Sequence, residues 1–201
     1  MVTDLLTSLR ERGLNTTRPL LVVIDGAKAL RRAVTDVFDH PVVQRCQLHK
    51  LRNVTDRLPD AVATTVAKRM RAAYHHSDPL VAQAELEALA RELDRSHPGA
   101  AGSLREGLAE TLTILRLGVP PTLARTLRST NSIESMTSIC RDHAANVKRW
   151  RDGQMALRWV AAGIGEAAKQ FRRVNGHLHL PALRAALEAT VTPNDYKEDA
   201  A

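Results

Sequence analysis

Two carboxylates stand where they could bind a metal ion. Asp25 follows the apolar run "LLVVI", which predicts a strand, and carboxylates at the carboxyl ends of such strands commonly bind ligands or metals. Glu134, in "RSTNSIESM", falls in the first turn of a predicted helix. Each also has a structural explanation, because Asp-Gly is a typical turn and Asn131 with Glu134 fits a capping box. The residues alone leave both alternatives open.

A second candidate is the pair Cys46 and His49 in "RCQLHK", which has C-x-x-H spacing. Two ligands do not complete a zinc site, which takes four protein ligands or three with water. The other histidines offer no second pair of suitable spacing, so we expect no zinc, a packed Cys46 and a polar or functional His49. Cys140 lies far from Cys46 in the sequence, so we expect both cysteines to be reduced.

The excess positive charge is confined to residues 122–184. This segment holds 11 Lys or Arg against four Asp or Glu, whereas the remaining 138 residues balance at 18 of each. Such a segment would attract a phosphate backbone, although a solvated helical face is the alternative. Trp150 and Trp159 could stack on bases, but their helical spacing favours the core. The candidates for DNA contact are Arg128, Arg141, Lys148, Arg149, Arg151, Arg172 and Arg173.

Composition predicts a mostly helical chain of α/β class. Of the 201 residues 44% are hydrophobic but only 3% aromatic, which disfavours a β-sandwich. There is no apolar stretch of about 20 residues and no apolar signal segment, so we expect no membrane association and a cytoplasmic location.

The hydrophobic pattern predicts a βαβ unit after a short amphipathic helix. Residues 3–13 form that helix, with Leu5, Leu6 and Leu9 on one face. A strand at 20–24, buried on both faces, leads to a helix with Leu30, Val34 and Val37 inward, and then to a strand at "VVQRC". The connecting helix makes the two strands parallel.

Helical periodicity dominates the remainder of the chain. "QLHKLRNVTDRL" should be a helix with Leu48, Leu51, Thr55 and Leu58 inward. Roughly three helices should fill residues 59–118, with breaks at 75–79 and 97–102. Later helices are expected at 131–144, 152–173 and 181–189, with Glu134 opposite Ile133 and Met136. The expected units are 1–58 and 119–189, which form a core, 59–118, which forms a helical insertion, and 190–201, which forms a frayed tail.

The motifs resemble those of a known enzyme family. "LLVVIDGAKALRRAV", "VQRCQLHKLRNV" and "RSTNSIESM" occur in the order of the D-G/A-x-K/R-x-L, Q-R-C-x-x-H-x-x-R-N and T-N-x-I-E motifs of bacterial Mutator-type DDE transposases. The segments "NVKRWRDGQMALRW" and "QFRRVNGHLHLPALRAAL" are also similar to the C-terminal portion of that family. The resemblance therefore extends over nearly the whole chain.

The resemblance implies an RNase H-like domain interrupted by an all-helical insertion, and an enzyme that transposes DNA. By position, Asp25 matches the second catalytic aspartate and Glu134 the catalytic glutamate, which would bind two Mg²⁺ or Mn²⁺ ions. Cys46, His49, Arg52, Asn53 and Asn131 match further positions of the motifs. His49 and Arg52 could contact a phosphate or an outer oxygen of the metal site. The implied partner is double-stranded DNA, at transposon ends and target.

The sequence departs from the family pattern at its N-terminal side. We find no match for the first aspartate and its strand, so we expect a truncated copy lacking the first three strands, weak or inert in DNA cleavage on its own. The remaining sheet would have an unpaired edge, which favours a homo-oligomer or a mixed oligomer with an intact transposase. A noncatalytic DNA-binding or regulatory remnant is the alternative. An unrelated Mg²⁺-dependent hydrolytic enzyme built on Asp25 would leave the Glu134 motif unexplained.

Overall fold

The computed structural model describes residues 1–191, which are mostly helical and include a small parallel sheet, as an α/β chain should. No helix in this part is long and apolar enough to cross a membrane. The elements are α1 (Val2–Glu11), β1 (Leu20–Ile24), α2 (Lys28–Val37), β2 (Pro41–Arg45), α3 (Gln47–Thr55), α4 (Asp60–Tyr74), α5 (Pro79–Asp94), α6 (Pro98–Arg105), α7 (Leu108–Thr111), α8 (Thr113–Arg116), α9 (Pro121–Leu127), α10 (Asn131–His143), α11 (Gly153–Ala168), a 3₁₀ turn (His177–His179) and α12 (Leu180–Val191).

The predicted βαβ unit is confirmed. β1 and β2 are parallel neighbours, paired from Leu20 with Pro41 through Ile24 with Arg45, and α2 connects them. The predicted burial of β1 on both faces is wrong, because only Ile24 is fully buried and the other residues of the strand are half-buried. A sheet of two strands offers too few neighbours to cover a whole strand.

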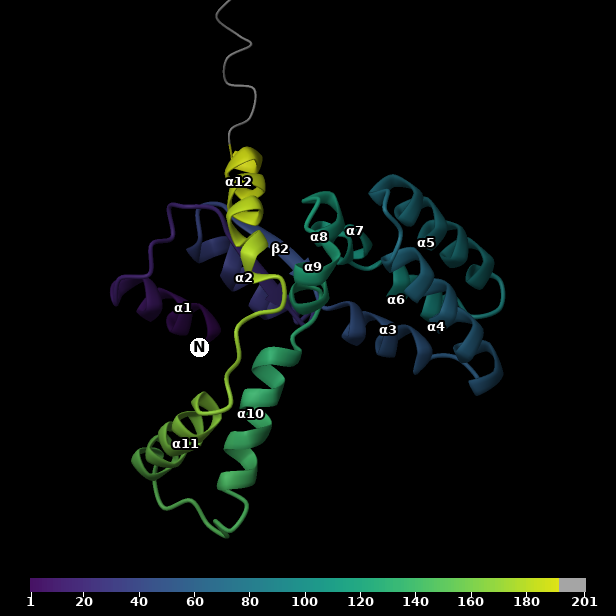
Figure 1. Ribbon diagram of the computed structural model, residues 1–201. Coiled ribbons are helices and arrows are strands. Elements are labelled where there is room, and N and C mark those ends of the chain that lie inside the picture. The colour runs from purple at the N-terminus through teal and green to yellow at the C-terminus, as the bar shows by residue number, and fades with distance from the viewer. Residues whose placement is uncertain (192–201) are drawn as a thin grey trace, which may run out of the picture.

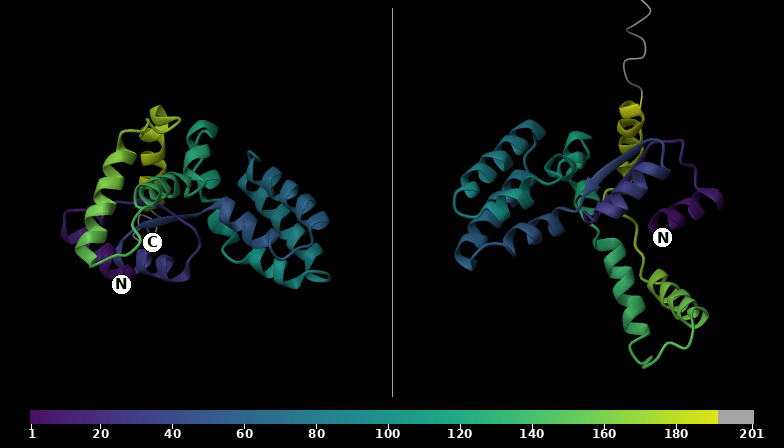
Figure 2. Two further views of the ribbon diagram at one scale, coloured as in Figure 1. Left: turned by 90° about the horizontal axis from the view of Figure 1, so that it is seen from below. Right: turned by 180° about the vertical axis from the view of Figure 1, so that it is seen from behind.

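Helices cover both faces of the sheet (Figures 1 and 2). On one face Val22 and Val43 contact a cluster around Val34 of α2, where Leu30, Val34 and Val37 all point inward as predicted. On the other face Leu21 and Val42 contact side chains of α8, α9 and α12. The strands alternate faces residue by residue, so each apolar run supplies both layers.

The N-terminal helix packs less than its pattern predicts. Of the three leucines expected on one face, only Leu6 reaches the apolar cluster of α2, whereas Leu5 and Leu9 are exposed. α1 contacts α2 but has no fully buried residue.

Helices α3 to α6 form a separate helical body beside the sheet (Figure 1). The expected break at 75–79 is present, and the second break is also present but lies at 95–97 instead of 97–102, because α6 begins at Pro98 and runs through Gly99 and Gly102. Burial of Ala100, Ala101 and Leu104 outweighs the low helix propensity of the two glycines. The single-turn helices α7 and α8 return the chain to β2.

The inward face of α3 differs from the prediction. Leu48 is 46% exposed, and the buried residues are Gln47, Lys50 and Val54. Polar side chains can face inward here because each finds a carbonyl: the Gln47 amide donates to the Thr111 carbonyl at 2.9 Å. Hydrophobic periodicity cannot detect a polar residue whose partner lies more than 60 positions away.

The last third of the chain begins with a helical hairpin, α10 and α11, that projects away from the sheet and the helical body (Figures 1 and 2). The helices meet closely where a Cβ on Gly163 would lie 2.8 Å from Cys140 Cα. Trp150 is 46% exposed, so the core expectation for it is wrong, while Trp159 is half-buried. Ile133 is 58% exposed because the first turns of α10 are not covered by another helix.

Two boundaries of this region also differ. α11 ends at Ala168, five residues earlier than predicted, and an irregular segment follows. α12 continues to Val191, into the expected tail 190–201, whose residues 192–201 lie outside the described part.

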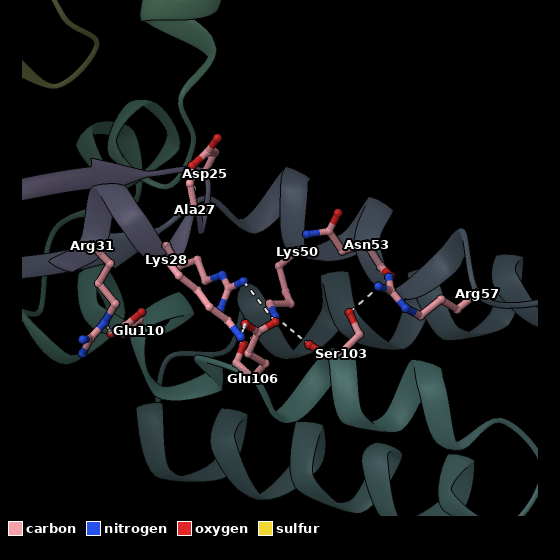
Figure 3. A network of polar contacts seen from close by, with 11 residues as sticks. Asp25, Ala27, Lys28, Arg31, Lys50, Asn53, Arg57, Ser103, Glu106 and Glu110 are labelled. Atoms are coloured by element: carbon pink, nitrogen blue, oxygen red, sulfur yellow. Dashed lines mark hydrogen bonds and ion pairs between the residues drawn. The ribbon is translucent and has the colours of Figure 1, made fainter. Parts of the chain in front are cut away.

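A buried polar network joins the sheet to the helical body (Figure 3). Lys50 is fully buried, and its ammonium donates to the carbonyls of Ser103 at 2.6 Å and Glu106 at 2.5 Å. Arg45, 6% exposed, donates to the same Glu106 carbonyl at 2.8 Å and pairs with the Glu106 carboxylate at 3.4 Å. Burial, and then the positive charge of Arg45, lower the pKa of Lys50 to about 8.

This network predicts a stability that rises with pH. Unfolded Lys50 titrates near 10.5 but folded Lys50 near 8, so between these values the unfolded chain binds more protons and a higher pH favours folding. The free energy of unfolding should rise by about 1 kcal/mol from about pH 7.5 to 9.5, allowing for screening. Urea unfolding monitored by circular dichroism measures it. The rise should vanish in Lys50→Met, and a flat or falling profile in the wild type would contradict the assignment.

Candidate functional site

The carboxyl ends of both strands and the start of α10 are tied together by backbone hydrogen bonds. The Cys46 amide donates to the Ile24 carbonyl at 2.7 Å, which joins the end of β1 to the start of α3. The next amide, of Gln47, donates to the Arg128 carbonyl at 3.0 Å, which fixes the segment leading into α10. Residues far apart in sequence thus meet at the edge where parallel sheets bind ligands.

Asp25 lies at this edge with an exposed side chain. Its Oδ1 accepts from the Ala27 amide at 2.9 Å, so the residue does form a turn after β1. It does not cap α2, whose N-cap position is Ala27. In Figure 3 its carboxylate points away from the network of Lys50 and Glu106. One oxygen is used by the turn, and the carboxylate as a whole faces outward.

Glu134 is joined to the Cys46 and His49 pair through Thr130. The Thr130 hydroxyl lies in hydrogen-bond contact with Glu134 Oε1, 3.3 Å from His49 Nδ1 and 3.4 Å from Cys46 Sγ. The carboxylate is the strongest of these acceptors, so the hydroxyl proton points to Glu134, and His49 Nδ1–H donates to the hydroxyl oxygen. His49 Nδ1 lies 3.7 Å from Glu134 Oε1. Thr130 thereby orients both functional candidates.

The capping-box alternative for Glu134 is wrong. α10 begins at Asn131, its N-cap position is Thr130, and no side chain caps the helix start. The Glu134 amide donates to the Thr130 carbonyl within the helical ladder, and the Glu134 carboxylate binds the Thr130 hydroxyl instead of a backbone amide. Asn131 is exposed. The Glu134 carboxylate therefore belongs to the cluster at the sheet edge and does not cap the N-terminus of α10.

The carboxylate oxygens of Asp25 and Glu134 suit a hard divalent cation, but two carboxylates are few ligands for such an ion. Among residues 1–191 no group of three His, Cys, Asp or Glu side chains lies close enough to hold a metal ion. Cys46 is fully buried, as expected, and its sulfur accepts from the Thr130 amide at 3.4 Å. Its position makes it a packed hydrogen-bond acceptor.

The basic residues expected to contact DNA lie on the hairpin and the irregular segment after it. Arg141, Lys148, Arg149, Arg172 and Arg173 are exposed there, and Arg151, also exposed, pairs with Asp152 at 3.3 Å. Arg128 instead donates to His75 Nε2 at 2.8 Å. Arg52 is exposed on α3, and Asn53 joins the polar network through its backbone carbonyl, which accepts from Ser103 Oγ at 3.2 Å.

The sequence analysis missed several residues that shape the site. One of them, Thr130, does carry a signal, since a threonine before a predicted helix often makes side-chain contacts. Nothing marks Lys50 or Arg45 as buried. Gln44 is also fully buried, and its amide links β2 to the Thr111 carbonyl at 3.0 Å and the Ile114 amide at 2.8 Å. These partners lie 67 and 70 positions away.

Comparison with known proteins agrees with the motifs. The profile of the Mutator transposase family matches residues 2–174. The transposase for insertion sequence element ISRM5 of Rhizobium meliloti is 29% identical over 90% of this chain and 44% of its own length. That for IS6120 of Mycolicibacterium smegmatis is 30% identical over 90% and 54%, and that for IST2 of Acidithiobacillus ferrooxidans is 28% identical over 72% and 48%.

The chain thus spans about half the length of the curated relatives it matches. The family profile covers most of the residues, including both carboxylates, the Cys46 and His49 pair and the hairpin. The chain belongs to the Mutator family of transposases.

Proposed function

We propose that this chain is part of the catalytic core of a DNA transposase, which cleaves and joins DNA at transposon ends by metal-dependent phosphoryl transfer. The observation that carries the proposal is the contact of Thr130 with Glu134, His49 and Cys46, which unites two family motifs at the carboxyl edge of the sheet. We further propose an RNase H-like core of residues 1–58 and 119–189, with 59–118 as a helical insertion. We also propose a cytoplasmic location, because the proposed substrate is DNA and the relatives come from bacteria.

Asp25 and Glu134 are the proposed ligands of Mg²⁺ or Mn²⁺. When bound, such ions activate the attacking oxygen and stabilise the leaving oxygen. Thr130 holds one oxygen of Glu134 and leaves the other for a ligand, while Ala27 does the same for Asp25. Because His49 Nδ1–H donates to Thr130, Nε2 of the neutral ring is a hydrogen-bond acceptor that would orient a water molecule, and only the doubly protonated ring would donate to a phosphate. Arg52, exposed on α3, would contact the DNA backbone.

A second candidate function is DNA binding without catalysis, alone or in a mixed assembly with an intact transposase. It is favoured by the absence, within residues 1–191, of any group of three acids or other metal ligands, since the family requires three acids. The exposed basic residues of the hairpin would suffice for binding phosphates. On the same ground we propose that the 201-residue chain alone does not cleave DNA.

The metal assignment predicts that Mn²⁺ broadens the amide NMR signals near Asp25 and Glu134 together, because one paramagnetic ion would lie near both. Asp25→Asn or Glu134→Gln should abolish the effect at both places. Asp142→Asn, which removes an exposed acid later in the same helix, is the matched control and should leave it intact. Broadening confined to one carboxylate, or insensitive to these changes, would refute a shared site.

The proposed contacts of the exposed basic residues with DNA phosphates predict that DNA binding depends steeply on salt concentration. In the double variant Arg172→Gln/Arg173→Gln, the slope of the logarithm of the DNA-binding constant against the logarithm of the salt concentration should fall by about 1 for each phosphate that is no longer neutralised. The control is Arg10→Gln/Arg12→Gln, which removes two exposed charges at the end of α1 and should leave the slope unchanged. Fluorescence anisotropy with a labelled duplex measures the slopes. Asp25→Ala and Glu134→Ala should bind as the wild type does.

Mg²⁺-dependent nicking by the wild-type chain, abolished in Asp25→Ala, would contradict the proposed inactivity.

The open sheet predicts self-association. Among the described residues β1 pairs only with β2, so its other edge is open to a strand of a second copy of the chain, whereas at the outer edge of β2 the Val43 carbonyl accepts from Thr113 Oγ1 at 2.7 Å. Light scattering should show a dimer that dissociates on dilution. Leu157→Glu/Ile164→Glu, which charges the exposed apolar side of α11, should stay dimeric if the edge is the contact. A monomer at every concentration would rule self-association out.

A further inference from the structure

A cavity of about 600 Å³ lies where the end of α4 meets α9 and the loop at residues 175 and 176. Tyr74, Leu115 and Val119 contribute apolar walls. The side chains that line it include four basic ones and no carboxylate: His75, His76, Arg125 and Arg128. None of these histidines nor Arg125 belongs to the family motifs described above. A cavity of this size accommodates a nucleotide-sized group.

The polar groups that the two histidines and two arginines leave free in the cavity are hydrogen-bond donors. His75 Nδ1 lies 2.7 Å from the Arg71 carbonyl and must carry a proton, so its Nε2 accepts from Arg128, whose other N–H groups remain available. His76 Nδ1 accepts from the Asp78 amide at 3.1 Å, which leaves an N–H on its Nε2. The Arg125 side chain has no partner among residues 1–191. Such a set matches a ligand that only accepts, which is the character of a phosphate.

The cavity lies one short segment of chain away from the site at the sheet edge. The Arg128 carbonyl accepts the Gln47 amide at 3.0 Å, and two residues later Thr130 binds Glu134 and His49. On the opposite wall, a Cβ on Gly176 would lie 2.5 Å from the Leu123 amide nitrogen, so the glycine lets the loop seal against α9. A group held by Arg128 is therefore one short segment away from the proposed metal ligands.

We propose that this cavity binds one backbone phosphate, with its sugar, of the DNA strand that reaches Glu134. Arg125 and Arg128 neutralise the phosphate, the His76 Nε2–H donates to it, and the apolar walls contact the sugar. The inference rests on the proposed DNA-binding function and adds to it a defined subsite between the helical insertion and the core. It differs from the cavities along the hairpin, each of which is lined by a single basic side chain, Arg141 in one and Arg172 in the other.

Thr122 provides a matched test. It lines the cavity, is exposed and stands in the first turn of α9, where a glutamate is favourable for the helix. Thr122→Glu adds a negative charge to the cavity, and Thr122→Gln adds the same bulk without charge. In Thr122→Glu the affinity for a labelled duplex at about 50 mM salt should fall about fivefold or more, and the salt slope should drop by about 1. Thr122→Gln should bind as the wild type does.

A second pair of variants tests the cationic side. Arg125→Gln should lower the slope in the same way, whereas Arg95→Gln, an exposed arginine at the end of α5, should not. Thermal unfolding of each variant verifies the fold. If Thr122→Glu and Thr122→Gln bind DNA alike, the subsite is refuted while DNA binding stands. If the wild type shows no salt-dependent binding, the proposed function itself fails and the subsite with it.

Titration with inorganic phosphate distinguishes a cavity that binds a phosphate of the DNA backbone from one that binds a free phosphate ion. Titrated into the wild type, it should shift the ring NMR signals of His75 and His76, and it should not do so in Thr122→Glu. If these shifts occur but the two Thr122 variants bind DNA equally, the cavity binds free phosphate and the assignment to DNA is overturned.

Discussion

The buried cations Lys50 and Arg45 are the constraint on which the arrangement of the chain depends. Desolvating two positive charges is costly unless each finds several acceptors, and here the acceptors come from the end of α6. That requirement fixes the end of α6 against β2 and α3. Because α3 begins at the sheet edge, the same contact determines where Cys46, Gln47 and His49 stand. The position of the candidate site thus follows from a polar contact outside it.

The βαβ unit could be predicted from sequence because its signals are local. The apolar runs of β1 and β2 and the inward face of α2 depend on neighbours within a few residues, so periodicity suffices. Lys50 and Leu48 could not be placed, since the orientation of α3 is set by carbonyls more than 50 positions away. The exposure of Trp150 was missed for a related reason: helical spacing favours a place in the core, but 46% of this side chain is exposed in the loop between α10 and α11.

The candidate site, like the fold, could be predicted from the sequence only in part. The types and order of Asp25, Cys46, His49 and Glu134 were sufficient to indicate the family, because motif spacing can be recognised without knowledge of contacts. How Cys46 and His49 meet Glu134 was not accessible, since Thr130 links them across more than 80 positions. The capping box failed because it considered only the local partner of Glu134. A carboxylate that has both a local and a distant partner cannot be assigned by local rules.

The hairpin of α10 and α11 separates the acid of the candidate site from the basic residues. Its two helices pack closely where Gly163 meets Cys140, and it is joined to the rest of the chain at the first turn of α10 and through the segment after α11. Glu134 lies in the first turn of α10, at the base of the hairpin, whereas the exposed residues Lys148, Arg149 and Arg151 lie in the loop between the two helices, at its tip. The length of α10 therefore sets how far the positive charge at the tip stands from the carboxylate at the base.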